Sequence, residues 1–222
     1  MLEENLKKVF EEIKNGNNLG EQITLVGATK TVPVEVINQA ITLGANIVGD
    51  NKVQEFNEKY PFIKGATYHF IGHLQTNKVK YLIGKVALIH SVDSLHLAQE
   101  ISKQSVKKGV TTNILIEVNI GGELSKSGVD LTNAEEIIES VSSLDGICLQ
   151  GLMAMLPKSD DTTYLEKLCL QMRELYDKMN KKGYNFKYLS VGMSADYKIA
   201  IRCGSNMIRL GSSLFGKRDY QT

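Results

Sequence analysis

The stretch ITLVGATKTVPVEVINQAITLGANIVGD, residues 23–50, combines two kinds of hydrophobic pattern. A short β-branched run, ITLVGA, is followed by the helical periodicity of VEVINQAITLG and then by a second short run, ANIVGD. This alternation is typical of two parallel strands joined by a helix. A Rossmann-like open sheet would carry a glycine-rich phosphate turn after its first strand. TKTVPV stands there instead, so that signature is missing.

The same alternation continues along the rest of the chain. Helical patterns such as residues 94–109 and 163–183 end in glycine, as helices often do. At about 28 residues per strand, each unit has room for a strand, a helix and two short loops. The sequence therefore predicts an α/β fold, a single (β/α)8 TIM barrel, with a flavodoxin-like or Rossmann open sheet as the alternative. Eight runs are expected as strands: ITLVGA (23–28), ANIVGD (45–50), TYHFIG (67–72), VALIHS (86–91), NILIEVN (113–119), ICLQGLMA (147–154), KYLSVG (187–192) and MIRLGSSLF (207–215).

The first residues predict an additional helix. MLEENLKKVFEEIKN carries charges throughout and has no continuous apolar segment, which is typical of an amphipathic helix and not of a secretory signal. This N-terminal helix, at about 1–18, can cover one end of the barrel. The chain contains no linker, low-complexity tract or long block of charge. We therefore expect one domain over residues 1–222.

The composition argues against several classes of function. Lys and Arg number 26 against 25 Asp and Glu, so the chain lacks the charge excess with which proteins bind nucleic acid or anionic membranes. No segment approaches the roughly 18 apolar residues that span a bilayer. Cys148, Cys169 and Cys203 are odd in number and widely spaced, which indicates reduced thiols and neither disulfides nor a zinc site. We expect a soluble, cytoplasmic protein.

Functional groups of such barrels lie at the carboxyl ends of the strands, and Lys30 is the first candidate. It follows ITLVGA directly and is the only charged residue between Ile23 and Val34. Apolar neighbours disfavour the ammonium form of a lysine, and the free amine is a nucleophile towards aldehydes. The alternative is an ordinary surface lysine in a loop.

The last two predicted strands suggest a site for an anion. Ser194 ends SVGMS just before the helical pattern ADYKIAIRCG, where it has the position of an N-cap. After the eighth strand, Gly211 permits close backbone approach, and Ser212 and Ser213 offer hydroxyl donors. The loops after strands seven and eight form the commonest phosphate site of this fold. With Lys30, these residues suggest a ligand that bears an aldehyde and a phosphate; the alternative is a helix cap and a Gly-Ser turn.

Arg209 lies within the eighth predicted strand, two residues before Gly211, so both face the same side. A buried arginine needs a partner, which is either an acidic group in a structural ion pair or a ring nitrogen of a bound heterocycle. His73 is either a loop histidine or a ligand contact, and Met153 can belong to the core. The remaining candidates at strand ends are Asp50, Asn51 and Asn119.

Seven segments, which include most of these candidate residues, resemble in order and spacing the pyridoxal phosphate homeostasis proteins of the YggS/PROSC type. The similarity runs from about Ile23 to Tyr220, and several separate motifs agree. GDN stands where GEN is more usual, and SVGMS stands where SMGMS is; neither change removes a cofactor contact. The segments are LVGATKTVPVEVINQAITLGANIVGDNKVQE, YHFIGHLQTNK, HSVDSLHLAQEI, LIEVNIGGELSKSGV, GLMAML, LSVGMSADYKIAI and IRLGSSLFGKRDY.

The resemblance implies a barrel like the N-terminal domain of alanine racemase standing alone, with pyridoxal 5′-phosphate (PLP) as its cofactor. It places a Schiff base on Lys30 and the arginine that faces the pyridine nitrogen at Arg209. It places the phosphate site at Ser194, Gly211 and Ser212. Three further positions are carried over as lining the cofactor pocket: Asn51, His73 and Met153.

The resemblance favours a PLP-binding protein without turnover that maintains the supply of vitamin B6, indirectly affects amino-acid and keto-acid metabolism and passes PLP to apoenzymes. An alternative is a PLP-dependent amino-acid racemase. The resembled racemases take a second base, a tyrosine, from a C-terminal β-domain across a dimer interface, and this chain ends seven residues after Phe215. We therefore expect a monomer and no efficient racemisation. A third possibility is an aldolase that uses Lys30 on a sugar phosphate without a cofactor.

Overall fold

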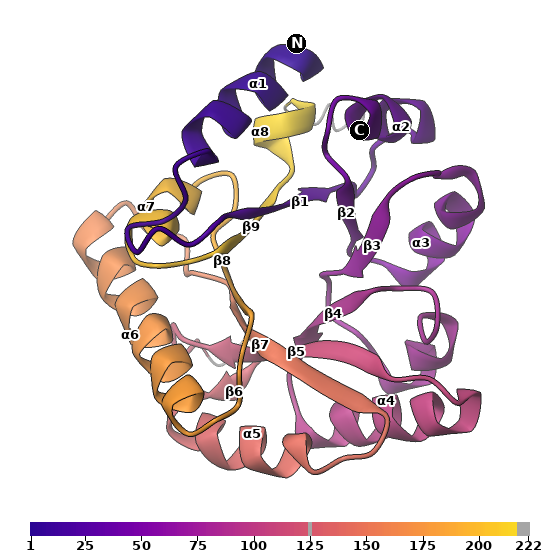
Figure 1. The fold of residues 1–222 in the computed structure, drawn as a ribbon, viewed down its shortest axis with the longest axis vertical. Helices are drawn as coiled ribbons and strands as arrows, with labels where there is room; N and C mark the ends of the chain where they lie inside the picture. Colours follow the sequence, from indigo (N-terminus) through magenta and orange to yellow (C-terminus); the bar gives the residue numbers. More distant parts are fainter. Residues whose placement is uncertain (124–125, 217–222) are drawn as a thin grey trace.

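The computed structural model describes residues 1–123 and 126–216, and within them the strands form a closed ring with helices outside it (Figure 1). Eight parallel strands follow one another in the order β1, β2, β3, β4, β5, β7, β8 and β9, and β9 pairs with β1. The short β6 pairs with β5. The strands are β1 (Thr24–Ala28), β2 (Ile47–Asp50), β3 (Thr67–Phe70), β4 (Leu88–Val92), β5 (Thr112–Asn119), β6 (Val129–Asp130), β7 (Ile147–Ala154), β8 (Tyr188–Val191) and β9 (Met207–Leu210).

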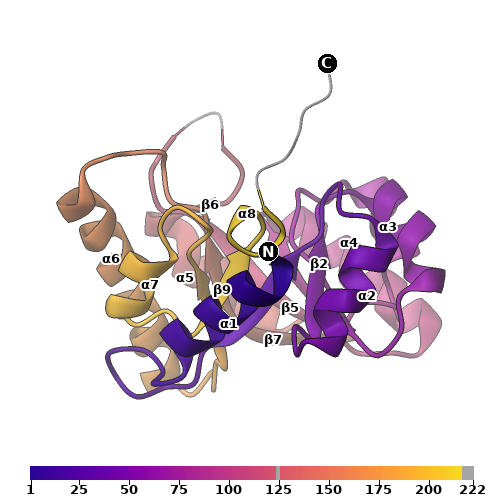
Figure 2. The ribbon, with the colours of Figure 1, turned by 90° about the horizontal axis from the view of Figure 1, so that it is seen from above.

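Helices follow most of the strands and cover the outside of the barrel (Figures 1 and 2). Gly109 ends α4 in the left-handed conformation, as its position after the helical pattern predicts. Among the described residues, no helix is long and apolar enough to cross a bilayer. The helices are α1 (Leu2–Ile13), α2 (Val34–Thr42), α3 (Val53–Lys59), α4 (Leu95–Lys108), α5 (Ala134–Ser142), α6 (Thr162–Lys181), α7 (Tyr197–Arg202) and α8 (Ser212–Phe215), with 3-10 turns at Tyr60–Phe62, Thr76–Tyr81 and Leu131–Asn133.

The predicted barrel is confirmed, and each of the eight predicted runs overlaps a barrel strand. The last run is correct only in its first half: β9 ends at Leu210, and residues 212–215 form the single turn α8. The backbone amides of Gly211 and Ser213 donate to the Ser194 side chain and not to a neighbouring strand. This contact is non-local, so the apolar pattern of the run does not reveal it.

The N-terminal helix is present but differs from the prediction in length and position. α1 ends at Ile13, and Gly16, with a φ of 77°, turns the chain back toward the barrel. The helix packs against the side of the barrel beside α8 and not across one end (Figures 1 and 2). Because α8 has only one turn, it leaves the outer faces of β1 and β9 uncovered. Leu6 and Val9 of α1 fill this gap in a cluster with Leu25, Ile208, Leu210 and Leu214.

The interior of the barrel has an apolar part and a polar part. Its apolar cluster includes Val26, Leu88, Leu115 and Met207, all nearly inaccessible to solvent. His90, Glu117 and Arg209 each lie two residues after Leu88, Leu115 and Met207, on the same strands and nearer to their carboxyl ends. Barrel interiors are usually filled by branched apolar side chains, so polar groups at this depth call for a specific reason.

Candidate functional site

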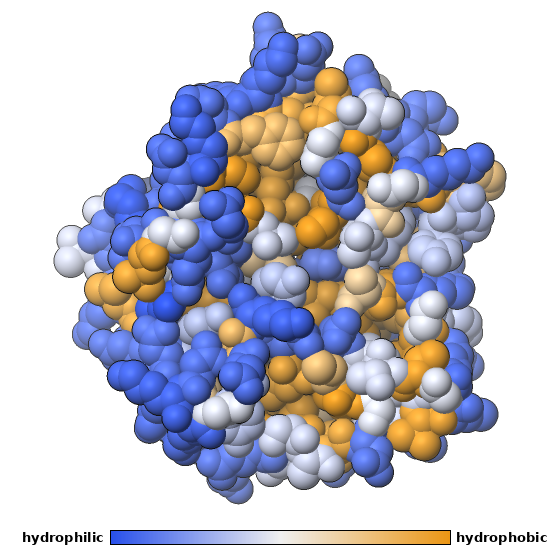
Figure 3. Space-filling model, viewed as in Figure 1, coloured by the Kyte–Doolittle hydropathy of each residue, from blue (hydrophilic) through white to orange (hydrophobic). Residues whose placement is uncertain are grey.

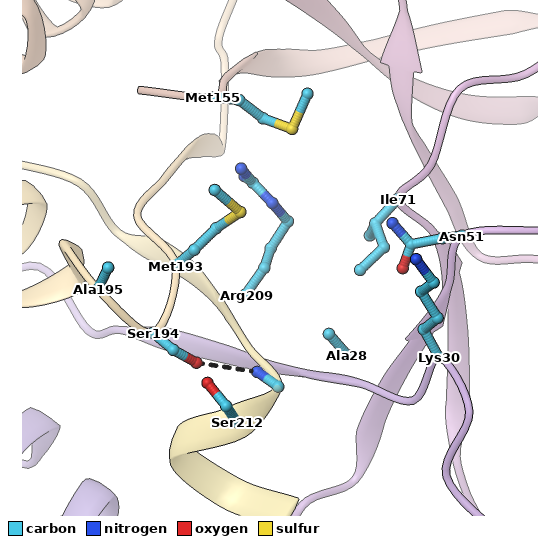
Figure 4. A pocket seen from close by; sticks show the side chains of 11 residues that line it. Ala28, Lys30, Asn51, Ile71, Met155, Met193, Ser194, Ala195, Arg209 and Ser212 are labelled. Atoms are coloured by element: carbon cyan, nitrogen blue, oxygen red, sulfur yellow. Dashed lines mark hydrogen bonds between the residues drawn. The ribbon is translucent and has the colours of Figure 1, made fainter. Parts of the chain in front are cut away.

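A pocket of about 610 Å³ opens at the carboxyl ends of the strands, where the fold places functional groups (Figure 4). A second pocket of about 420 Å³ adjoins it and shares Lys30, Gly211 and Ser212. In Figure 3, hydrophilic side chains crowd the rim of the molecule and hydrophobic atoms are visible mainly between them. The larger pocket is lined by Ala28, Lys30, Asn51, Ile71, Met155, Met193, Ser194, Ala195, Arg209, Gly211 and Ser212.

One side of this pocket, the lysine wall, consists of Ala28, Lys30 and Asn51 (Figure 4). Thr29 precedes the lysine and is fixed by its hydroxyl, which donates to Asp50 Oδ1 at 2.8 Å and lies 3.1 Å from the Gly49 carbonyl oxygen. Lys59 Nζ donates to the Thr29 carbonyl at 2.8 Å. The residue before Lys30 is therefore held from both its side chain and its backbone.

The residue after Lys30 is held in a strained conformation. Thr31 has a φ of 63°, in the left-handed region that a β-branched residue rarely adopts. Its backbone N–H donates to Glu55 Oε1 at 2.5 Å, and the same oxygen accepts from Lys59 Nζ at 2.5 Å. Thus α3 supplies the charged pair that stabilises the turn and fixes the backbone from which the Lys30 side chain leaves.

The buried end of this arrangement is Asp50, the last residue of β2, which is inaccessible to solvent. Burial raises the pKa of its carboxyl, whereas the Thr29 hydroxyl and the positive charge of Lys59 act in the opposite direction. Lys59 Nζ lies 3.9 Å from Asp50 Oδ1. Asp50, a strand-end residue in the sequence analysis, thus supports the lysine turn from below and does not line the pocket.

The opposite side, the serine wall, consists of Met193, Ser194, Gly211 and Ser212. Ser194 Oγ accepts from the backbone N–H of Gly211 at 3.2 Å and of Ser213 at 3.1 Å (Figure 4 draws the first). Two amides therefore converge on one acceptor oxygen at the pocket, the arrangement that backbone anion sites use.

Ser194 does not cap α7 as predicted. The helix begins at Tyr197, and the residue at its N-cap is Asp196, whose Oδ1 accepts from the backbone N–H of Met193 at 2.6 Å. Asp196 thereby closes the turn that presents Ser194 to the pocket. The Ser194 hydroxyl instead accepts the amides at the start of α8, a partner that lies 17 residues further along the chain.

Arg209 forms the floor of the pocket between the two walls (Figure 4) and is only 4% exposed. Its Nη1 donates to the carbonyl and hydroxyl of Ser190 at 2.7 and 2.6 Å, and its Nη2 donates to the Ala154 carbonyl at 3.0 Å. Burial lowers the pKa of Arg209 to about 10, which leaves it charged at neutral pH. Within the described chain it forms no ion pair closer than 4 Å, so its direct partners are neutral.

Two of the predicted cofactor contacts lie outside the lining of this pocket. His73 is largely exposed on the loop after β3, where its Nδ1 lies 3.3 Å from Asp93 Oδ2. Met153 is buried inside the barrel with the apolar cluster, and Met155, two residues further along, lines the pocket. The structure brings together the other six: Lys30, Asn51, Ser194, Arg209, Gly211 and Ser212.

Several polar residues beneath the pocket are not among those predicted from the sequence. His69, His90, Glu117 and Ser190 are all almost fully buried. Burial and the nearby Asp93 raise the pKa of Glu117 to about 7, whereas the positive charge of Arg209 acts in the opposite direction. The strand alternation contained a signal, since His90 shares a face with Leu88 and Glu117 with Leu115. Both residues lie within strands, so a prediction made from strand ends does not include them.

Comparison with known proteins places the chain in a family. The family model described as "Alanine racemase, N-terminal domain" matches residues 5–219. The pyridoxal phosphate homeostasis protein of Aquifex aeolicus is 42% identical over 221 residues, covering 98% of this chain and 95% of the relative. The same-named protein of Escherichia coli K12 is 35% identical over 206 residues, covering 90% and 88%.

Solved structures agree with the fold. PipY of Synechococcus elongatus, with PLP bound, superposes with a TM-score of 0.87 at 26% identity and covers 97% of this chain and 100% of that one. Alanine racemase of Clostridium difficile, in complex with cycloserine, has a TM-score of 0.79 at 19% identity. Its match covers 98% of this chain but 59% of the racemase, so that likeness concerns the barrel alone.

Proposed function

The chain belongs to the pyridoxal phosphate homeostasis proteins, within the alanine racemase N-terminal domain family, and on this premise we propose that it binds PLP and serves in PLP homeostasis. The observation that carries the proposal is the layout of the pocket. An amine, a buried cation and a pair of converging amides lie on the lysine wall, the floor and the serine wall of one cavity (Figure 4). PLP carries an aldehyde, a ring nitrogen and a phosphate, which are the three groups that such a pocket can hold.

The residues of the serine wall are suited to bind the phosphate group of PLP. The amides of Gly211 and Ser213 already converge on one oxygen, that of Ser194, and a phosphate oxygen can accept in the same way. The hydroxyls of Ser194 and Ser212 add donors at the same edge. Because both amides already point to one spot at the pocket edge, little rearrangement of the backbone is needed when the phosphate binds.

Lys30 provides the amine for covalent attachment. Its backbone is fixed on both sides, by Thr29 and by Thr31, so the half-buried side chain leaves the turn toward the pocket. When bound, PLP supplies an aldehyde that condenses with a lysine amine and an aromatic ring that can accept electrons. Asn51 lies beside Lys30 and can orient the groups around the aldehyde (Figure 4).

We further propose that the chain is a carrier and not a racemase. Arg209 remains protonated at neutral pH and presents donors from the pocket floor, which keeps the ring nitrogen unprotonated and makes the ring a poor electron acceptor. In the described lining of the pocket, Lys30 and Arg209 are the only ionisable side chains. Racemisation needs an acid or base on each face of the substrate, so this lining favours PLP storage and transfer to apoenzymes. We propose, in addition, that the chain acts as a monomer.

The binding proposal is tested by adding PLP to the purified chain and removing the excess by gel filtration. We expect one PLP per chain, an absorbance band in the visible range and covalent labelling after borohydride reduction. An aldolase that works without a cofactor would show no band. Absence of both retained PLP and the band would contradict the proposal.

The carrier proposal is tested by deuterium incorporation at Cα of L- and D-alanine in D₂O. General acid and base groups typically contribute about 10² to 10⁴ in rate, so lacking one should leave only slow exchange. Exchange that depends on Lys30 and turns over at about 1 to 10³ per second would instead indicate a racemase.

A further inference from the structure

A chain of hydrogen bonds runs through the barrel interior beneath the pocket. His69 Nδ1 lies 2.9 Å from His90 Nε2, and His90 Nδ1 lies 3.2 Å from Ser190 Oγ. Ser190 Oγ in turn accepts from Arg209 Nη1 at 2.6 Å. These four side chains come from β3, β4, β8 and β9, and each is at most 4% exposed. This series of hydrogen bonds therefore crosses the barrel and ends on Arg209 in the pocket floor.

The chemistry of the arginine determines which group donates in each of these hydrogen bonds. A guanidinium can only donate, so Ser190 Oγ is the acceptor and its own hydrogen is free to donate. The side-chain acceptor within reach of that hydrogen is His90 Nδ1, which must then be unprotonated. His90 consequently carries its proton on Nε2 and donates to His69 Nδ1. Each hydrogen bond then has one donor and one acceptor, and both imidazoles are neutral.

The same contacts limit how Arg209 can turn. Three of its five N–H groups are used, two on Ser190 and one on the Ala154 carbonyl. The remaining N–H groups, one on Nη2 and one on Nε, have no partner among the described residues. A guanidinium held on Nη1 by two bonds cannot rotate without breaking both.

We propose that His90 is a positioning residue: through Ser190, and backed by His69, it holds Arg209 so that the unused N–H groups face the ring nitrogen of PLP. This inference rests on the proposed function. His90 itself does not line the pocket and acts through Ser190. Burial lowers the pKa of both histidines, so the neutral forms that this arrangement requires prevail at neutral pH.

The first test examines the hydrogen-bond chain in the protein without PLP. Two-dimensional ¹⁵N–¹H NMR of the imidazoles should show His90 and His69 protonated on Nε2 only, whereas the exposed His73 and His96 serve as internal references. In Ser190→Ala, the His90 Nδ1 loses its donor, and we expect a mixture of tautomers. A proton on His90 Nδ1 in the unaltered chain, or an unchanged tautomer in Ser190→Ala, would overturn the inference.

The second test examines the effect on PLP. We expect His90→Leu to weaken PLP binding about 3- to 10-fold, the effect of one neutral hydrogen bond, and to shift the ¹⁵N resonance of isotopically labelled PLP ring nitrogen. His90→Asn should restore both, because its amide oxygen can accept from Ser190 as Nδ1 does. A merely structural role would change stability and leave the ring resonance in place. If His90→Leu fails to fold, Ser190→Ala takes its place, because it removes the link between His90 and Arg209. It should weaken PLP binding and shift the ring resonance, and the absence of both changes would overturn the inference.

The two proposals fail separately. If the unaltered chain retains no PLP, the proposed function is overturned, and this inference with it. If the unaltered chain binds PLP but His90→Leu binds it with equal affinity and an unshifted ring resonance, only the role of His90 is overturned.

Discussion

The two walls of the pocket are held in place by different means. The lysine wall depends on charged side chains and a strained turn: Asp50, Glu55 and Lys59 hold the residues on either side of Lys30. The serine wall depends on backbone amides that converge on a hydroxyl. Each of the charged groups that support the lysine wall can be removed by a single substitution, but a backbone amide cannot. Substitutions should therefore be more damaging on the lysine wall than on the serine wall.

The largest effect is expected at the centre of the lysine wall. Lys30→Ala should abolish borohydride-trapped PLP, because Lys30 is the only lysine in the described lining of the pocket. Non-covalent PLP should remain, since the serine wall is intact. The control is Lys181→Ala, which removes an exposed lysine at the end of α6. Undiminished labelling of Lys30→Ala, measured by mass spectrometry, would mean that another lysine carries the cofactor.

The support beneath that wall should be the next most sensitive. Lys59→Met leaves the buried Asp50 and the partly buried Glu55 without their cation, and removing the partner of a buried charge in this way costs about 3 kcal/mol. We expect a loss of this order in the free energy of unfolding, measured with urea, and slower covalent attachment at Lys30. Lys181→Met is the matched control. Equal stability of the two variants would show that Lys59 does not hold the turn.

The buried polar side chains beneath the pocket, His69 and Glu117 among them, should make the stability of the protein depend on pH. Burial lowers the pKa of His69 to about 4, below its ordinary value of 6.5. Between these values the unfolded chain binds a proton that the folded chain does not, so stability falls as pH drops from 6.5 toward 4, by about 1.4 kcal/mol per unit. Glu117, whose pKa is raised, contributes the opposite slope between pH 4.5 and 7.

Comparison with His69→Gln separates the two groups. The variant keeps the Glu117 contribution and lacks that of His69, so the unaltered chain should lose about 2 kcal/mol more than the variant between pH 6.5 and 4.5. Urea unfolding at a series of pH values measures the difference. Parallel curves for the two proteins would mean that His69 titrates normally in the folded state.

Single substitutions on the serine wall should have moderate effects. Ser194→Ala and Ser212→Ala should each weaken PLP retention about 10-fold, the lower end of what a hydrogen bond to a charged group contributes. The amides of Gly211 and Ser213 remain in both variants and limit the loss. Ser143→Ala, at the exposed end of α5, is the control. Unchanged affinity in both variants would place the phosphate elsewhere.

How far the sequence predicts this molecule depends on the range of the contacts. The barrel follows from local patterns, because a run such as ITLVGA and the helix after it are recognisable within about 20 residues. Lys30, Arg209 and Gly211 could be placed at the pocket because strand ends gather there. The N-cap assignment of Ser194 was wrong since its true partners lie 17 and 19 residues away.

The buried polar side chains beneath the pocket show more clearly that distant contacts cannot be predicted from local patterns. Strand alternation can place His90 inside the barrel, but its partners His69 and Ser190 are 21 and 100 residues away in the sequence. The single turn of α8 likewise explains why α1 packs on the barrel side, although nothing near α1 indicates it. Periodicity thus predicts which face a residue occupies, and only the closed barrel determines which groups meet there.

The smallest effect is expected at Thr31, and its sign is opposite to the others. Its left-handed φ of 63° costs a β-branched residue about 1 kcal/mol, whereas glycine adopts this conformation freely. Thr31→Gly should therefore raise the free energy of unfolding by about 0.5 kcal/mol, after the greater freedom of glycine in the unfolded chain is subtracted. Asn185, with a φ of 55°, is the matched control at an exposed position far from the pocket. Asparagine tolerates this region better than threonine, so Asn185→Gly should gain less. Urea unfolding of both variants measures the difference, and a loss of stability in Thr31→Gly would show that its hydroxyl bond to the Lys30 carbonyl outweighs the strain.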